Sequence, residues 1–242
     1  MSHFCVLVIG DNPEEQLAKY DENLELPMHK TASKEELIAK ERSRIEDYQN
    51  TIYAKYLQDP EKYKRLCSNK GHIEYLEEEF PKMLEWTDEQ CYEEAIKPYR
   101  EYMEDGEKWC EVHEDGSLWK TTNENAKWDW WQMGGRYRGR LKLKAPRMDA
   151  PLYTGWQSNN DSLEYERLKK EGYCDQAYSH EVENLDEFVP FAIVKDGEWH
   201  QRGEYGWWGI VTEEIDNWDE VAKNLTKDLP HGTLLTVIDC HI

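Results

Sequence analysis

The sequence predicts an α+β fold, in which a mixed or antiparallel sheet has helices on one face and carries an inserted block of helices. Two apolar runs, residues 4–9 and 234–238, are rich in Val, Ile and Leu and predict buried strands at the centre of the sheet. Residues 33–104 instead space their apolar side chains three, four and seven positions apart, which is typical of amphipathic helices. From residue 108 onward, short apolar runs separated by turn residues indicate further strands.

The first half of the chain is predicted to be mainly helical. Ser33 with Glu36 and Thr87 with Gln90 have the spacing of capping boxes, which mark where two long helices begin. Helices are expected over residues 13–20, 33–57, 73–80 and 88–103.

The second half is predicted to supply most of the strands. Strands are expected over residues 109–113, 118–122, 136–144, 191–194, 207–211 and 234–238, and helices over 163–170 and 218–229. Residues 145–162 hold Pro, Gly, Ser and Asn and are expected to form a loop. We expect the strands to join one sheet, so that residues 1–242 form a single main domain with residues 33–104 as a helical insertion within it.

The chain is strongly acidic. It has 30 Lys and Arg residues against 51 Asp and Glu residues, which gives a net charge of −21. Such a charge repels nucleic acids and anionic membranes, so we expect no direct binding to DNA or RNA. The charge is compatible with solubility, with a basic protein partner or with imitation of the charge of a nucleic acid.

No segment is predicted to enter a membrane. The longest apolar run, residues 4–9, is far shorter than the ~20 residues that a membrane-spanning helix needs. No Lys or Arg precedes this run, unlike the start of a signal peptide. The 6 cysteines are widely spaced and form no C-x-x-C pair, so we expect reduced thiols and a cytoplasmic protein.

The first candidate site is a row of cations that follows two glycines. If residues 136–144 form a strand, alternation points five side chains to one face: Arg136, Arg138, Arg140, Lys142 and Lys144. Gly134 and Gly135 would let backbone N–H groups approach an anion closely, and arginine presents a planar fork to phosphate. Two interpretations remain open, namely a site for a nucleotide or phosphate, and pairing with acidic side chains of the same chain.

The second candidate is a group of tryptophans. Trp128, Trp130 and Trp131 lie just before the glycines, and Trp207 and Trp208 lie in a later predicted strand. Tryptophan faces stack on nucleobases, which together with the arginines would suit a nucleotide. The alternative is that these side chains pack in the core.

The third candidate is a set of histidines at strand ends. If the two terminal strands are neighbours, His3 and His241 meet near Asp239, whereas His200 lies in another predicted hairpin. A histidine beside a carboxylate can transfer protons, so these three histidines would act as acid or base if the protein is an enzyme. The sequence contains no metal-ligand spacing, phosphate-binding loop or dinucleotide glycine fingerprint, so we predict no metal and no cofactor.

Four boxes of sequence stand out together along the chain. They are MSHFCVLVIG (residues 1–10), KWDWWQMGGRY (127–137), GEYGWWGIV (203–211) and LTVIDCH (235–241). In combination they resemble a family of uncharacterised proteins found in bacteriophages and in some bacteria. The resemblance runs nearly end to end and implies a phage or prophage accessory protein that acts inside a bacterial cell. It implies no activity and no catalytic residue.

These observations support one leading hypothesis and two alternatives. The leading hypothesis is a non-enzymatic, phage-type binding protein that interferes with a host process, such as antiviral defence. Its acidic surface would occlude a basic, nucleic-acid-binding host protein, or its arginines and tryptophans would sequester a small anionic nucleotide. The alternatives are an enzyme that acts on a nucleotide or phosphoester, and a structural or assembly protein of the virion.

Overall fold

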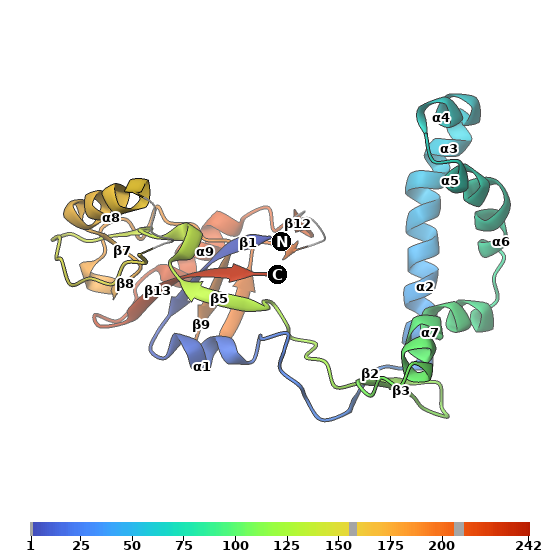
Figure 1. The fold of residues 1–242 in the computed structure, drawn as a ribbon, viewed down its shortest axis with the longest axis horizontal. Helices are drawn as coiled ribbons and strands as arrows, with labels where there is room; N and C mark the ends of the chain where they lie inside the picture. Colours follow the sequence, from blue (N-terminus) through green and yellow to red (C-terminus); the bar gives the residue numbers. More distant parts are fainter. Residues whose placement is uncertain (1, 155–158, 206–210) are drawn as a thin grey trace. The chain divides into compact units, whose positions relative to one another are not determined.

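The chain divides into two compact units (Figure 1). The computed structural model describes residues 2–154, 159–205 and 211–242. The sheet unit consists of Met1–Leu24 and Asn123–Ile242, and the helical unit consists of Glu25–Thr122. The helical unit is thus inserted, in sequence, between the two parts of the sheet unit. It contains the whole of the predicted insertion, residues 33–104.

A six-stranded mixed sheet forms the centre of the sheet unit. Its strands are β1 (His3–Ile9), β5 (Trp130–Met133), β8 (Gln176–Tyr178), β9 (Ala192–Lys195), β10 (Glu198–Gln201) and β13 (Leu234–His241). The order across the sheet is β10-β9-β1-β13-β5, and β8 also pairs with β13. β1 and β9 run parallel, and the other neighbours are antiparallel. The predicted α+β class with a mixed sheet is confirmed.

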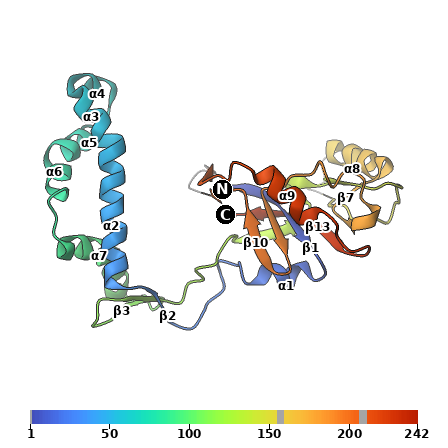
Figure 2. The same ribbon diagram turned by 180° about the vertical axis from the view of Figure 1, so that it is seen from behind.

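The two terminal strands lie side by side in the middle of the sheet, as predicted. β1 and β13 pair from His3 opposite His241 to Ile9 opposite Leu235. Beyond this ladder the Ser2 N–H donates to the Ile242 carbonyl over 3.1 Å, so residues 2 and 242 lie close together (Figures 1 and 2). Both strands are buried along almost their whole length, which explains why their sequences read as nearly unbroken apolar runs.

Helices cover both faces of this sheet. The helices of the sheet unit are α1 (Pro13–Ala18), α8 (Asn159–Glu171) and α9 (Trp218–Thr226). On one face Val6 packs in a cluster with Leu17 of α1, and on the other Leu7 packs with Trp218 of α9. We predicted helices on one face only, and α1 differs from that expectation. The central strands are apolar on both sides, so both sides need a cover that excludes water.

The rest of the sheet unit is made of short elements. β6 (Leu141–Lys142) pairs with β7 (Tyr173–Cys174), β11 (Glu204–Tyr205) pairs with β12 (Val211–Thr212), and 3-10 turns span Gly135–Tyr137 and Ser179–Glu181. The predicted strand over 136–144 is therefore wrong except at β6. Gly134, Gly135 and Gly139 all adopt positive φ angles, which turn this segment into a loop.

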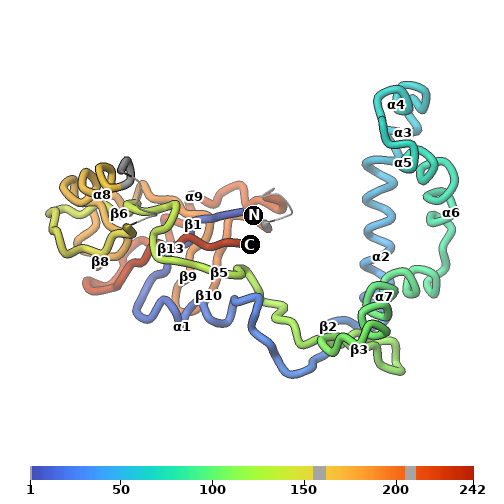
Figure 3. The backbone as a smooth tube through the Cα atoms, viewed as in Figure 1, coloured from blue at the N-terminus to red at the C-terminus, as the bar shows by residue number. Residues whose placement is uncertain are grey.

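The helical unit is built around two long helices, α2 and α7. Its helices are α2 (Lys34–Tyr48), α3 (Ala54–Gln58), α4 (Pro60–Leu66), α5 (Lys70–Glu74), α6 (Phe80–Met83) and α7 (Asp88–Glu104), and Figure 3 traces the chain through them. Both predicted capping boxes form, because the Ser33 side chain accepts from the Glu36 N–H and the Thr87 side chain from the Gln90 N–H. Among the described residues, no helix is long and apolar enough to span a membrane.

A small three-stranded sheet completes the helical unit. Its strands β2 (His29–Ala32), β4 (Leu118–Lys120) and β3 (Cys110–Val112) are antiparallel and lie in that order. We predicted that the hairpin of β3 and β4 joins the main sheet, and this prediction is wrong. Cys110 and Leu118 pack with Leu37 of α2 and Ile96 of α7. The hairpin therefore buries its apolar side chains within its own unit.

Candidate functional site

A polar patch lies at one end of the sheet face that also packs against α9. Strand alternation places His3 on this face, because the odd-numbered residues of β1 point toward α9. The register sets His3 beside His241 of β13, and His241 beside Trp130 of β5. Two residues further along β13, Asp239 pairs in the same way with Gln132. Strand pairing thus gathers five side chains from three strands that are distant in the sequence.

Each of the two histidines is held by a carboxylate. His3 Nδ1 lies 2.9 Å from Asp239 Oδ1, and His241 Nδ1 lies 2.6 Å from Asp129 Oδ1. The two ring centroids are 5.0 Å apart. Asp239 is fully buried, whereas the His3 side chain keeps 11% of its surface exposed. The carboxylates fix the orientation of both rings, and one face of the patch stays open at His3.

Trp130 covers the second histidine. Its ring stacks on His241 with the centroids 5.3 Å apart and the planes 17° apart, and it meets the His3 ring at 81° with the centroids 5.4 Å apart. Trp130 is nevertheless 40% exposed. Asp129 thus holds His241, His241 supports one face of the indole, and the tryptophan still presents aromatic surface to the solvent.

The arginine loop, which we define as residues 134–140, is tied to this patch by hydrogen bonds. The Arg136 N–H donates to Asp239 Oδ2 over 2.9 Å, and the Tyr137 hydroxyl donates to the His3 carbonyl over 2.9 Å. Gln132 Nε2 lies 3.4 Å from the same Asp239 oxygen. A single buried carboxylate therefore links the loop to the His3 ring.

A second buried carboxylate, Asp175, holds the other end of the arginine loop. It accepts the Gly139 N–H over 2.5 Å and the Tyr153 N–H over 2.6 Å. Burial raises the pKa of this carboxyl to about 6, although these two backbone hydrogen bonds act in the opposite direction. The loop is thus clamped at both ends by carboxylates that water does not reach.

The two adjacent glycines make room for these carboxylates. Gly134 and Gly135 have φ angles of 69° and 51°, a region that disfavours other residues. A Cβ atom on Gly134 would overlap the Asp175 carboxylate, and one on Gly135 would overlap Asp239. The Gly134 N–H donates to the Val237 carbonyl over 2.8 Å and so contributes to folding.

An open pocket of about 900 Å³ lies between the arginine loop and the polar patch. Its lining comprises His3, Trp130, Gln132, Gly135, Arg136, Arg138, Gly139, Arg140, Tyr153 and Glu164. Arg136 and Arg140 are exposed, whereas the Arg138 side chain is mostly buried, with its Nη2 2.5 Å from Glu164. Three guanidinium groups thus meet one lining carboxylate, and the pocket is cationic in a chain of net charge −21. We call it the arginine pocket.

The structure brings together part of each predicted site. Of the predicted residues, the pocket lining contains His3, Trp130, Gly135, Arg136, Arg138 and Arg140. The predicted row of five cations does not form, because the segment turns as a loop at Gly134, Gly135 and Gly139 instead of continuing as a strand. Lys142 pairs with Glu183 over 3.4 Å, and Lys144 Nζ donates to the His180 carbonyl over 2.8 Å. Lys142 and Arg138, which pairs with Glu164 of α8, fit the paired alternative that the sequence left open, whereas Lys144 donates to a backbone carbonyl.

The other tryptophans and histidines have different surroundings. Trp128 is buried in the core on the α1 side, where its Nε1–H donates to the Leu17 carbonyl over 3.3 Å, and Trp131 packs against the same cluster. His200 belongs to β10, at the opposite edge of the sheet from β5. Trp207 and Trp208 lie outside the described residues.

Several residues of the site were not identified from the sequence. They are Asp129, Gln132, Tyr153, Glu164 and Asp175. Gln132 could have been identified from the sequence, because strand alternation puts it on the same face as Trp130. Asp175 and Tyr153 had no local signal, since their role depends on hydrogen bonds to segments that are distant in the sequence.

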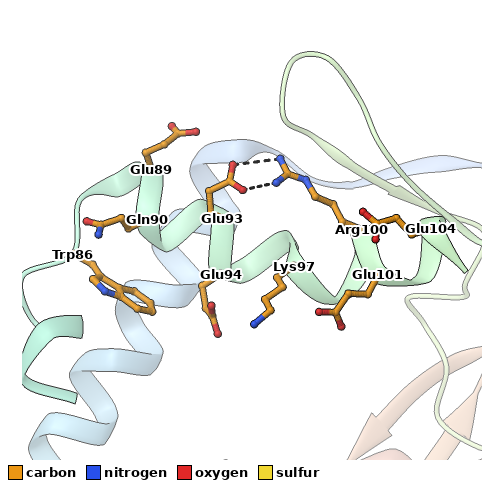
Figure 4. A pocket seen from close by; sticks show the side chains of 9 residues that line it. All are labelled: Trp86, Glu89, Gln90, Glu93, Glu94, Lys97, Arg100, Glu101 and Glu104. Atoms are coloured by element: carbon orange, nitrogen blue, oxygen red, sulfur yellow. Dashed lines mark hydrogen bonds and ion pairs between the residues drawn. The ribbon is translucent and has the colours of Figure 1, made fainter. Parts of the chain in front are cut away.

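The helical unit carries a separate groove of about 550 Å³ along α7. Its lining comprises Trp86, Glu89, Gln90, Glu93, Glu94, Lys97, Arg100, Glu101 and Glu104 (Figure 4). Glu93 neutralises Arg100, whereas Glu94 and Glu101 project to another side of the helix together with Lys97. The groove is therefore acidic.

No protein-family model matches the chain, and no curated protein or solved structure matches it either. Within the described part of the chain, no group of three or more His, Cys, Asp or Glu side chains could hold a metal ion. The chemistry of the two sites is therefore inferred from their residues and geometry.

Proposed function

We propose that the sheet unit binds a small nucleotide in the arginine pocket and so withdraws it from a process of the bacterial host cell. The observation that carries this proposal is that two exposed arginines, a third arginine paired with Glu164, and an exposed tryptophan line a single pocket. The host context comes from the family resemblance of the sequence.

The arginines fit the phosphate groups of such a ligand. Guanidinium groups bind phosphate oxygens through paired, charge-assisted hydrogen bonds. The backbone of the loop is already held by Asp239 and Asp175, so the guanidinium groups of Arg136 and Arg140 start from a fixed loop. A preorganised loop lowers the entropy that binding would otherwise lose.

Trp130 fits the base of the same ligand. Stacking of a base on a tryptophan contributes about 1–3 kcal/mol and is tolerant of the base. The indole already rests on His241 at an interplanar angle of 17°, so a base on its exposed side would extend an existing stack. Phosphate alone would gain nothing from this ring, which favours a nucleotide over inorganic phosphate.

Isothermal titration of the purified protein with ATP, GTP, CTP, UTP and inorganic phosphate tests the proposal. We expect nucleotides to bind more tightly than phosphate, and Arg136→Ala to lose about 1.5–3 kcal/mol of binding, roughly 10- to 150-fold in Kd. Lys142→Ala is the matched control, because it removes a cation that pairs with Glu183 instead of lining the pocket. Equal binding by native protein and Arg136→Ala, or no binding by either, would refute the proposal.

A second candidate function, occlusion of a basic host protein, is favoured by the groove on α7. Five glutamates line it, and the Arg100 cation is neutralised by Glu93. A salt-sensitive complex with a basic protein, lost in Glu94→Lys/Glu101→Lys but kept in Arg136→Ala, would support this route. A complex that survives both charge reversals would exclude α7 as its binding surface.

A further inference from the structure

We propose that the arginine pocket also hydrolyses the phosphoanhydride bond of its nucleotide, with His3 as the general base. This inference depends on the proposed function, because the substrate is the nucleotide that the pocket binds. It adds a chemical step to binding, and it uses the one feature of the site that binding alone does not require, namely a histidine fixed by a buried carboxylate.

The geometry of His3 is that of a positioned base. Asp239 is fully buried and engages Nδ1 at 2.9 Å, so Nε2 is the ring atom that would take a proton. His3 lines the same pocket as Arg136 and Arg140, which would hold the phosphates. The same Asp239 carboxylate accepts the Arg136 N–H, so the base and the phosphate-binding loop are fixed to one group.

The step balances with water as the only other reactant. His3 Nε2 takes one proton from a water molecule as the water oxygen forms a bond to the terminal phosphorus. The bond between that phosphorus and the bridging oxygen breaks, and its electron pair stays on the bridging oxygen of the departing nucleoside diphosphate. His3 then releases its proton to the solvent. The arginines stabilise the charge that develops on the transferred phosphoryl group.

The number of histidines in the pocket indicates which class of phosphorus–oxygen bond the site would cleave. Among the described residues that line it, His3 is the one histidine. An alkoxide leaving group would need a second group to protonate it, whereas a phosphate leaving group departs as a stable anion. The site therefore suits a nucleoside triphosphate better than a phosphate ester of an alcohol.

Two variants of His3 test the assignment. In His3→Asn the amide nitrogen can replace Nδ1 as the donor to Asp239, which preserves the fold but removes the base. We expect it still to bind the tightest nucleotide of the panel and to lose about 10²–10⁴-fold in turnover. In His3→Ala we expect the same loss and partial recovery on addition of imidazole, which a purely structural role would not give.

The readouts are release of inorganic phosphate, with and without Mg²⁺, and titration calorimetry on the same samples. His200→Ala is the matched control, since it removes a histidine from the opposite edge of the sheet and should change neither readout. Native protein that binds nucleotide without turnover, or His3→Asn that keeps native turnover, overturns the catalytic inference and leaves the proposed function intact. Absence of nucleotide binding overturns both.

Discussion

Replacement of Asp175 by Asn should change how the stability of the sheet unit depends on pH. Burial raises the pKa of this carboxyl from its ordinary value of 3.8 to about 6. The folded protein therefore holds the Asp175 proton more tightly than the unfolded chain does. The stabilisation from this proton is complete below about pH 4 and is lost as the pH rises to about 6. The amide introduced by Asp175→Asn cannot titrate, so the variant lacks this contribution.

The size of the effect follows from the shift. One pKa unit corresponds to about 1.4 kcal/mol, so the difference between 3.8 and about 6 corresponds to about 3 kcal/mol. We expect the free energy of unfolding of native protein, relative to Asp175→Asn, to fall by about that amount between pH 4 and pH 7. Comparison with the variant cancels the effect of the other carboxylates, which titrate in both proteins.

Urea unfolding, followed by tryptophan fluorescence at intervals between pH 4 and pH 7, measures this difference. If the two units unfold in separate transitions, the one shifted by Leu7→Ala belongs to the sheet unit, because Leu7 is fully buried there and its truncation costs about 2–5 kcal/mol. A difference that stays constant with pH would refute the desolvation of Asp175. A difference that grows with pH would show that the hydrogen bonds from Gly139 and Tyr153 outweigh burial.

Two further substitutions test the local reasoning. Gly135→Ala should destabilise the sheet unit by more than the about 1–2 kcal/mol that a positive φ angle costs, because its Cβ also overlaps Asp239. Gly106 also has a positive φ angle, but no atom lies within 4 Å of the Cβ that Gly106→Ala would add. This control should therefore show the backbone cost alone in urea unfolding. Equal losses of stability at the two sites would contradict the overlap with Asp239. Ser33→Ala should destabilise the helical unit by about 1 kcal/mol, since it removes the cap of α2, whereas Ser43→Ala, on the exposed face of α2, should have little effect.

The parts of the fold that the sequence predicted are those set by local or continuous patterns. The strands β1 and β13 were recognisable because both are buried on two faces and so are almost wholly apolar. The capping boxes at Ser33 and Thr87 were recognisable because each needs only four residues of chain. Neither pattern depends on which other element packs nearby.

The arginine loop shows why the alternation of its residues predicted the wrong conformation. Arg136, Arg138 and Arg140 alternate as strand residues do, yet the glycines before and among them adopt positive φ angles. What decides the conformation is the space that Asp239 and Asp175 occupy, and these carboxylates come from distant positions in the sequence. Sequence reasoning found the arginines for their charge but could not foresee the buried acids that shape their loop.

The same buried acids explain how an acidic chain maintains a cationic pocket. A buried carboxylate must find hydrogen-bond donors, and arginine side chains would be the obvious ones. Asp239 instead accepts from His3, from Gln132 and from the Arg136 N–H, and Asp175 accepts from the backbone of Gly139 and Tyr153. The carboxylates thus accept hydrogen bonds from backbone N–H groups of the loop, and the guanidinium groups of the loop line the pocket. Gly134 and Gly135 permit these hydrogen bonds, because a Cβ atom at either position would overlap one of the two carboxylates and keep it from the loop backbone.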